Sequence, residues 1–142
     1  MKTYLLVVEC AIEWRGKFLI IKRPAGKHAG GMLAFPGGKV DAEDEVCSQD
    51  MLRYAAKREV LEEVGLTLLD PLTYISSHFF VGSDGSHILD TIFHCVLDQT
   101  IPEVVASERE VPEYAWMTPT EILQADNAPV WLKDYIHLID AK

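Results

Sequence analysis

Basic residues are scarce in this chain. Its 142 residues include 13 lysines and arginines against 22 aspartates and glutamates, which gives a formal net charge of −9 at pH 7. A charge of this sign repels nucleic-acid backbones and anionic membranes, so we expect no nucleic-acid polymer and no membrane as a partner. An anionic small-molecule substrate would need a local positive charge beside it, and a bound divalent metal ion would supply one.

Cysteine is also rare, and long apolar runs are absent. The three cysteines, Cys10, Cys47 and Cys95, show no CxxC or Cys/His spacing, which indicates free thiols in a reducing compartment. The apolar opening 4–12 is interrupted by Glu9 and lacks a small-residue cleavage site, so it does not predict a signal peptide. No stretch reaches the roughly 20 apolar residues that span a bilayer. We therefore expect a cytoplasmic protein.

The chain shows no internal repeat, low-complexity tract or linker, and its length suits one domain, which we place at residues 1–142. Apolar runs between glycine turns predict strands, and periodic apolar positions with capping residues predict helices. The expected strands are 4–14, 18–21, 32–35, 67–81, 87–97 and 114–117, and the expected helices are about 51–64, a short one from Thr118, and 128–141. This interleaving predicts a mixed sheet covered by helices, an α/β or α+β fold.

Several local signals mark turns and helix ends. The Pro-Gly-Gly sequence at 36–38 is a turn signal, and the acidic segment 41–50 has no useful periodicity, so we predict a loop there. Thr118, Pro119 and Glu121 suit the N-cap, N1 and N3 positions of a helix start. The last helix has apolar side chains available for packing, namely Val130, Trp131, Tyr135, Leu138 and Ile139.

The most informative stretch is a helical run that ends at Gly65. Ser48 or Asp50 can cap its start, and a glycine at the C′ position ends it. Three of its glutamates are spaced i, i+3 and i+4, which puts their carboxylates on one face about one turn apart. These are Glu59, Glu62 and Glu63.

The three glutamates share their arc of the helix with apolar side chains, namely Leu52, Ala55 and Ala56. A solvated acidic face is one interpretation, but a surface helix normally carries its charges opposite the apolar stripe, whereas these continue it. The carboxylates are therefore expected to point toward the body of the protein. Buried unpaired carboxylates are too costly to keep, and Mg²⁺, which prefers hard oxygen ligands, resolves the conflict. Arg58, next in sequence, can hold one glutamate by a charge-assisted pair.

The stretch from Arg58 to Leu66, REVLEEVGL, together with the preceding FPGGKV, resembles the Nudix box. That motif has the form G-x5-E-x7-R-E-U-x-E-E-x-G-U, where U is a bulky aliphatic residue, and the second half matches at every defined position. The first half is about six residues longer than the pattern. The slot of its first glutamate falls on Asp44 when counted from Gly38 and on Asp50 when counted from Arg58. We interpret this as a loop insertion and prefer Asp50, which is near the helix start.

The resemblance implies a Nudix-type α/β/α sandwich with a mixed β-sheet. It also implies a hydrolase that depends on Mg²⁺ or Mn²⁺ and cleaves a diphosphate linkage in a nucleoside diphosphate derivative. Metal ions would neutralise phosphate charge, orient a water for attack and stabilise the leaving oxygen. By motif match the metal ligands are Glu59, Glu62 and Glu63, with the carbonyl of Gly38 as a further candidate, and Arg58 orients the glutamates.

The resemblance also suggests where a catalytic base lies. Some family members use a glutamate shortly before a tryptophan in a late strand to bind metal or activate water. Glu110, six residues before Trp116, has that spacing. Glu108 and Glu113 are rivals, and a solvated loop acid is the alternative for each of them.

Within the family the chain is similar to MutT-like nucleoside triphosphate pyrophosphohydrolases, which are small single domains. Arg23 and Lys39 stand where such enzymes contact phosphates, and Phe80 or Phe79 can stack on a base. Asn127 precedes Ala-Pro and resembles the segment where a MutT-type asparagine reads a purine edge, although a plain turn asparagine also suits that position. We therefore expect a small nucleotide as the substrate.

Two other functions remain open within the resemblance. One is a pyrophosphatase for ADP-ribose or another nucleotide sugar or dinucleotide, which is disfavoured because 80–84 lacks the proline that ADP-ribose hydrolases tend to have there. The other is a non-catalytic nucleotide-binding module, which usually loses the helix glutamates that this chain retains. The sequence is compatible with a monomer or a homodimer.

Overall fold

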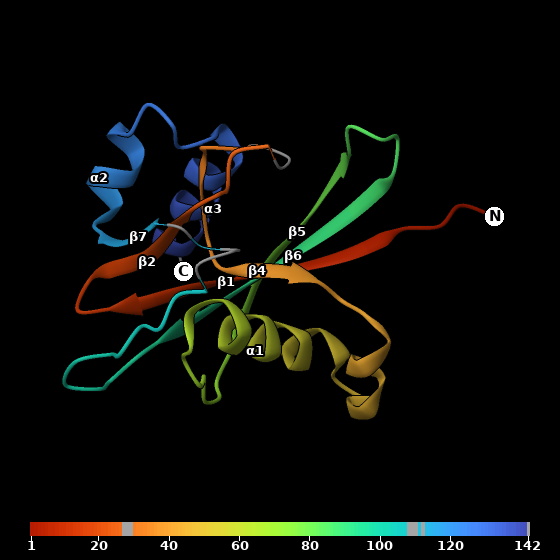
Figure 1. The fold of residues 1–142 in the computed structure, drawn as a ribbon, viewed down its shortest axis with the longest axis horizontal. Helices are drawn as coiled ribbons and strands as arrows, with labels where there is room; N and C mark the ends of the chain where they lie inside the picture. The colour runs from red at the N-terminus through yellow and green to blue at the C-terminus, as the bar shows by residue number, and fades with distance from the viewer. Residues whose placement is uncertain (27–29, 108–110, 112, 142) are drawn as a thin grey trace.

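The computed structural model describes residues 1–26, 30–107, 111 and 113–141. A mixed sheet runs through the molecule in the order β3-β2-β1-β6-β5, with β4 added beside β1 and β7 beside β2 (Figure 1). β1 and β6 are parallel, and the other strand pairs are antiparallel. The strands are β1 Leu5–Trp14, β2 Lys17–Lys22, β3 Leu33–Ala34, β4 Gly37–Lys39, β5 Thr73–Val81, β6 His87–Val96 and β7 Glu113–Met117. The helices are η1 Ala42–Cys47, a 3₁₀-helix, and α1 Met51–Val64, α2 Pro119–Gln124 and α3 Val130–Asp140.

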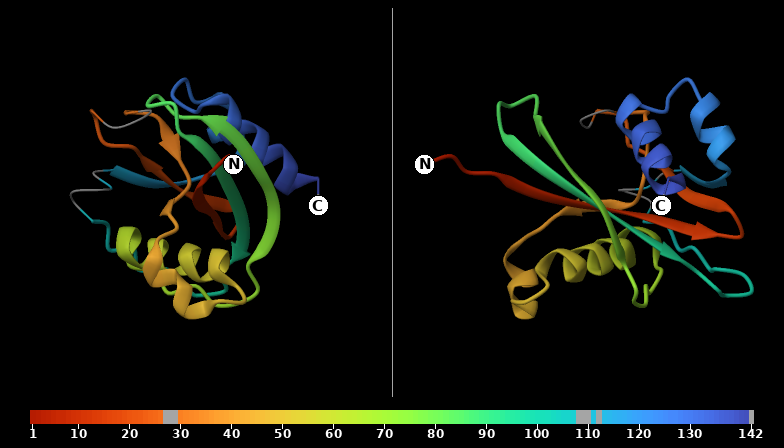
Figure 2. Two further views of the ribbon diagram at one scale, coloured as in Figure 1. Left: turned by 90° about the vertical axis from the view of Figure 1, so that its right-hand side faces the viewer. Right: turned by 180° about the vertical axis from the view of Figure 1, so that it is seen from behind.

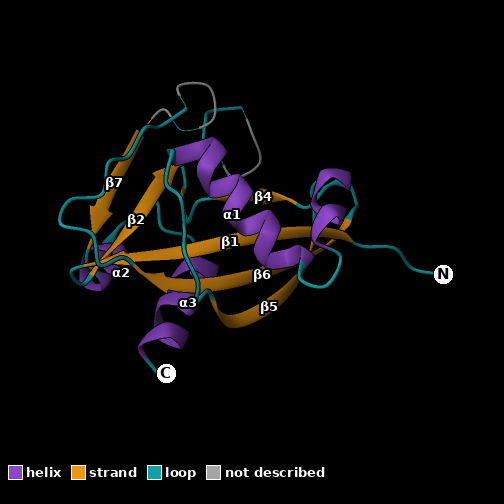
Figure 3. Ribbon diagram, turned by 90° about the horizontal axis from the view of Figure 1, so that it is seen from below, coloured by secondary structure: helices purple, strands orange, loops and turns teal. Residues whose placement is uncertain are grey.

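Helices cover both faces of the sheet, as the sequence predicts. α1 lies across β1, β4 and β6 on one face, and α3 lies on the other (Figures 2 and 3). Each face has its own apolar core, because successive residues of a strand point to opposite sides. Val8 and Cys10 of β1 are buried against α1, whereas Ala11 is buried in the cluster that includes Leu132 and Ile136 of α3. The chain is thus organised in three layers.

Both helix ends with strong local signals form as predicted. α1 ends at Gly65, which has a positive φ of 70° and donates its backbone N–H to the Leu61 carbonyl at 3.0 Å. Thr118 and Glu121 form the reciprocal capping box at the start of α2. Asp50 occupies the N-cap position of α1, but its side chain makes no capping hydrogen bond.

Two predictions for the segment before α1 are wrong. The residues 36–38 do not form a turn, because Gly37 and Gly38 belong to β4 and pair with β1. A Cβ on Gly37 would collide with the carbonyl oxygen of Val8, so the glycine permits this close approach of two strands. The segment 41–50 is not wholly a loop, since η1 forms there and is closed by a capping box between Asp41 and Asp44.

The boundaries of two later elements also differ from the prediction. β5 begins at Thr73 instead of residue 67, because Leu66, Leu68 and Leu72 fill the core under α1 from a segment outside the sheet. α3 buries Leu132, Tyr135, Ile136 and Ile139, whereas three of the side chains expected to pack are exposed, namely Val130, Trp131 and Leu138. The expected set spanned more of the helix circumference than one packing face can hold. Within the described ranges, no helix is long and apolar enough to cross a membrane.

Candidate active site

The three glutamates of α1 differ in burial. Glu63 is 8% exposed, and the Glu59 and Glu62 side chains are 15% and 49% exposed. The Gly37 backbone N–H of β4 donates a hydrogen bond to Oε1 of Glu63 at 2.7 Å. The carboxylates of Glu59 and Glu63 therefore lie against the sheet, and Glu62 lies at the edge of the site.

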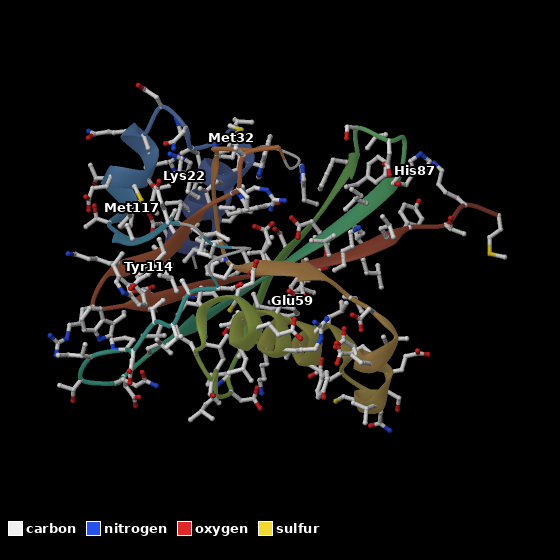
Figure 4. All side chains as sticks on the ribbon, viewed as in Figure 1. Lys22, Met32, Glu59, His87, Tyr114 and Met117 are labelled. Atoms are coloured by element: carbon white, nitrogen blue, oxygen red, sulfur yellow. The ribbon has the colours of Figure 1, made fainter. Side chains whose placement is uncertain are left out.

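β4 provides the wall that faces these carboxylates. Figure 4 shows Glu59 between α1 and β4. A Cβ built on Gly38 would collide with the carboxylate of Glu59, so no other residue type leaves room for this side chain where it stands. The two consecutive glycines therefore have different roles: Gly37 permits contact with β1, and Gly38 leaves space for the acidic cluster.

Arg58 contacts residues from three different elements of the site. Its Nε and Nη2 atoms bond both carboxylate oxygens of Asp44 at 2.7 and 2.9 Å. Its Nη1 atom lies 2.9 Å from Oε1 of Glu59 and 3.2 Å from Oε2 of Glu62. The Nη2 atom also donates to the carbonyl oxygen of Lys39 at 3.0 Å. One guanidinium, 11% exposed, thus connects η1, β4 and α1.

The contact between Arg58 and Asp44 fixes both charges. Hydrogen bonds from Arg58 lower the pKa of Asp44 below its usual value, even though burial opposes this. The same hydrogen bonds, followed by those with Glu59, raise the pKa of Arg58 further above its usual value. Both side chains are therefore ionised across the physiological range.

The structure corrects the preference for Asp50 as the first acid of the box. Asp50 lies at the start of α1, where it contacts Nη1 of Arg53 at 3.3 Å, away from Arg58. Asp44 is fully buried and fills the place opposite Arg58. The inserted residues form the rest of η1 and the turn after it, which brings the chain back so that Asp44 faces a residue 14 positions later. The motif spacing counted backward from Arg58 falls on Asp50, because the spacing cannot show that η1 folds back toward the arginine.

The donor set fits a hard divalent ion such as Mg²⁺ or Mn²⁺. Three carboxylates lie within one turn of helix, beside a glycine that leaves space for them. In the described part of the chain, however, no three acidic, histidine or cysteine side chains are arranged as a metal cage. Glu59 and Glu62 bond to Arg58, and Glu63 bonds to Gly37. An ion must therefore compete with these hydrogen bonds for the glutamate oxygens.

The candidate phosphate-binding residues lie at the ends of two different strands. Arg23 follows β2, where its backbone N–H donates to the Met32 carbonyl at 2.9 Å, and its charge acts on Glu9 and Asp90. Lys39, the last residue of β4, is exposed. The two positive charges therefore come from different parts of the sheet.

The candidate base-binding residues are already engaged in contacts. The side-chain amide of Asn127 donates to the Gly31 carbonyl at 3.2 Å and thereby ties the segment before α3 to the segment before β3. Phe80 of β5 is half-buried and stacks on His78, with ring centroids 6.0 Å apart. Its neighbour Phe79 is 49% exposed and packs edge-on against Tyr4, on the other side of β5.

The predicted catalytic base cannot be placed. Glu110 and its rival Glu108 lie outside the described residues. The second rival, Glu113, begins β7 with a side chain that is 68% exposed and lies 3.8 Å from Nζ of Lys22. The role of Glu110 stays a prediction.

The sequence analysis missed two acids on the face of the sheet that carries α3. Asp90 of β6 is 5% exposed, and Glu9 of β1 is half-buried. The Tyr135 hydroxyl of α3 donates to Oδ2 of Asp90 at 3.5 Å. A signal was present in the sequence, because each acid stands within a run of mainly apolar strand residues.

Comparison with known proteins agrees with the motif and the fold. The NUDIX domain family model matches residues 6–139. The CTP pyrophosphohydrolase of Escherichia coli (strain K12) is 33% identical over 129 residues, which cover 87% of this chain and 82% of that protein. The crystal structure of a MutT protein from Methanosarcina mazei Go1 superposes with a TM-score of 0.81 at 25% identity and covers 99% of this chain and 95% of its own. The solution structure of the E. coli ORF135 protein gives a TM-score of 0.74 at 28% identity, covering 99% and 91%.

These matches confirm the mixed α+β fold. They also confirm the resemblance to the Nudix family, on which the choice of site residues was based. They extend over nearly the whole chain and include a relative that acts on a pyrophosphate bond. The chain belongs to the NUDIX domain family, and it is a MutT-like hydrolase of pyrophosphate bonds.

Proposed function

We propose that the protein hydrolyses a nucleoside triphosphate between its α- and β-phosphates and releases a nucleoside monophosphate and pyrophosphate, with Mg²⁺ or Mn²⁺ as the cofactor. The observation that carries the proposal is the cluster of Glu59, Glu62 and Glu63 beside Gly38, held by one arginine. CTP is the first candidate substrate, because the E. coli relative is a CTP pyrophosphohydrolase.

In this proposal the three glutamates hold the metal ion. When bound, the ion neutralises phosphate charge and activates a water molecule. Arg58 orients Glu59 and is itself fixed by the two hydrogen bonds from its guanidinium to Asp44. Arg23 and Lys39 attract the phosphates, in a protein whose overall charge would otherwise repel them.

The proposal is tested by measuring pyrophosphate release from CTP, UTP, ATP and GTP with Mg²⁺. We expect turnover of at least one triphosphate and its loss when the metal is removed with a chelator. Glu62→Gln or Glu63→Gln should lower kcat by orders of magnitude, because each removes a metal-binding charge. Glu45→Gln, the same change at an exposed residue of η1, is the matched control.

Three results would contradict the proposal. Hydrolysis of ADP-ribose or a dinucleoside polyphosphate, without turnover of any triphosphate, would support the alternative pyrophosphatase. Tight nucleotide binding without turnover of any of these compounds would support a binding module. Unchanged Mg²⁺-dependent activity in both glutamine variants would remove the helix glutamates from the reaction.

A further inference from the structure

A buried acidic residue lies in the middle of the sheet, on the face that carries α3. Asp90 of β6 stands in register with Val7 of β1 on one side and with His78 of β5 on the other. Asp90 is 5% exposed, and His78 is exposed. A charged side chain at the centre of a sheet needs partners, and its contacts therefore show whether it serves the fold alone.

One oxygen of this carboxylate accepts from a hydroxyl group, and the other lacks a permanent donor. The Tyr135 hydroxyl of α3 donates to Oδ2 of Asp90 at 3.5 Å. Within the described ranges, Oδ1 of Asp90 is buried and accepts no hydrogen bond from a permanent donor, although the neighbouring Glu9 carboxyl can share a proton with Asp90. A buried acceptor left unpaired destabilises a fold. An unpaired acceptor is therefore a position where a bound ligand can supply the missing donor.

The acid lies close to the proposed catalytic centre. Glu9 of β1 interacts with Asp90, and burial and the charge of Asp90 raise the pKa of Glu9 well above its usual range, with a smaller contribution from Glu63. The backbone of Glu9 pairs with Gly37, whose N–H donates to Glu63 at 2.7 Å. A single strand, β4, thus connects this pair of acids to the helix that carries the glutamates.

Aromatic rings surround the acid. His78 stacks on Phe80 at 6.0 Å and meets Tyr135 edge-on at 6.3 Å. Tyr135 in turn stacks on Phe35 at 6.4 Å. The tip of the β5–β6 hairpin runs on beyond α3, whereas Asp90 lies where Tyr135 of the helix still reaches the sheet (Figure 1). Flat apolar surfaces next to a hydrogen-bond acceptor suit a nucleobase.

We propose that Asp90 is a specificity-determining residue whose Oδ1 accepts a hydrogen bond from an exocyclic amino group of the substrate's base. The proposal rests on the proposed triphosphate hydrolysis and adds the class of base. Cytosine and adenine carry the required amino group, whereas uracil and hypoxanthine carry a carbonyl oxygen at the same ring position. A carbonyl would face the carboxylate without a proton between them, which is repulsive. The base reaches Oδ1 by displacing the exposed side chain of His78.

The test compares pairs of nucleotides that differ mainly at that ring position: CTP with UTP, and ATP with ITP. kcat/KM is measured for each triphosphate with Mg²⁺, and Kd is measured by calorimetry for the four corresponding monophosphates. We expect the wild-type protein to prefer each amino base by about tenfold or more, the typical effect of a hydrogen bond to a charged group. Asp90→Asn should bring both ratios close to one, because an amide can donate to the carbonyl. Asp140→Asn, the same change at an exposed residue at the end of α3, should leave them unchanged.

The outcomes separate the two proposals. Turnover of triphosphates with equal kcat/KM and Kd for amino and keto bases would overturn the role of Asp90 and leave the proposed function standing. Absence of turnover would overturn the proposed function, and the monophosphate Kd ratios would then decide the role of Asp90. An unchanged ratio in Asp90→Asn with a shifted Tm would show that the oxygen is satisfied by a proton of Glu9 alone. If Asp90→Asn fails to fold, wild-type ratios close to one would still overturn the role of Asp90.

Discussion

At the scale of single residues, Arg58 and Asp44 determine how the acidic cluster is held. Three glutamates in one turn of helix repel one another, and one guanidinium contacts two of them while it bonds a buried aspartate. Removing Asp44 would free Arg58 to move toward the glutamates. The stability of the fold and the positions of the metal-binding glutamates therefore both depend on the ion pair between Arg58 and Asp44.

Asp44→Asn should destabilise the protein in a pH-dependent way. Because Arg58 lowers the pKa of folded Asp44, its ionisation stabilises the fold above its unfolded value of about 3.9. That stabilisation is lost as the pH falls from about 4 through the lower folded pKa. We expect the variant to be less stable by about 2 kcal/mol at pH 7 and the difference to disappear in strong acid. Urea unfolding at a series of pH values measures this.

Asp50→Asn is the matched control for that experiment, because Asp50 is the other acid that the motif spacing allows. Its side chain is 48% exposed and contacts only Arg53 among the ion pairs of the described residues. We expect a change of less than about 0.5 kcal/mol at every pH. A larger effect of Asp50→Asn than of Asp44→Asn would reverse the assignment made from the structure.

At the scale of elements, β4 combines two constraints in adjacent glycines. A Cβ on Gly37 meets the backbone of Val8, which cannot move without separating two strands. A Cβ on Gly38 meets the end of the Glu59 side chain, which can rotate away. Alanine in place of Gly37 should therefore affect stability, whereas alanine in place of Gly38 should affect catalysis.

Gly37→Ala should lower the free energy of unfolding by about 2 kcal/mol or more, since the backbone must shift. Gly38→Ala should leave Tm within a few degrees of wild type and lower kcat about 10- to 100-fold, because Glu59 is pushed from its place. Thermal unfolding and pyrophosphate release measured on both variants check this. Equal loss of stability in the two variants would show that Gly38 serves the fold and not the site.

The elements that local chemistry specifies were predicted from the sequence, and those that depend on distant contacts were not. The end of α1 at Gly65 and the capping box of Thr118 involve residues within a few positions of each other. η1 was missed because its acidic composition resembles a loop and its stability depends in part on Arg58, 14 residues beyond Asp44. Burial of single residues within a strand is likewise a tertiary property.

The same distinction applies to the site. The glutamates of the box could be found because helical spacing alone brings them together. Asp90 and Tyr135 are 45 residues apart and meet only when α3 packs on the sheet. An acid among mainly apolar strand residues indicates that another group contacts its carboxylate in the folded protein. The sequence does not show which residue or ligand supplies that group.

At the scale of the whole molecule, the net charge of −9 and the acidic cluster affect stability together. Any cation screens the repulsion among surface carboxylates, whereas an ion held by the glutamates stabilises only the folded state. Magnesium binding must therefore be separated from general screening by comparing MgCl₂ with NaCl at equal ionic strength.

We expect 10 mM MgCl₂ to raise Tm by about 2–5 °C over NaCl of equal ionic strength, as follows from a Kd near 1 mM and about 1.4 kcal/mol of linkage. Glu62→Gln should lose most of this difference, because it removes a half-exposed charge from the metal site and leaves the core intact. Glu45→Gln should keep it. The Tm of Glu62→Gln is also measured without magnesium. We expect it to equal or exceed the wild-type Tm, because the substitution relieves repulsion among the three glutamates. A wild-type Tm that responds identically to the two salts would mean that the glutamates, as Arg58 holds them, bind no magnesium in the absence of substrate.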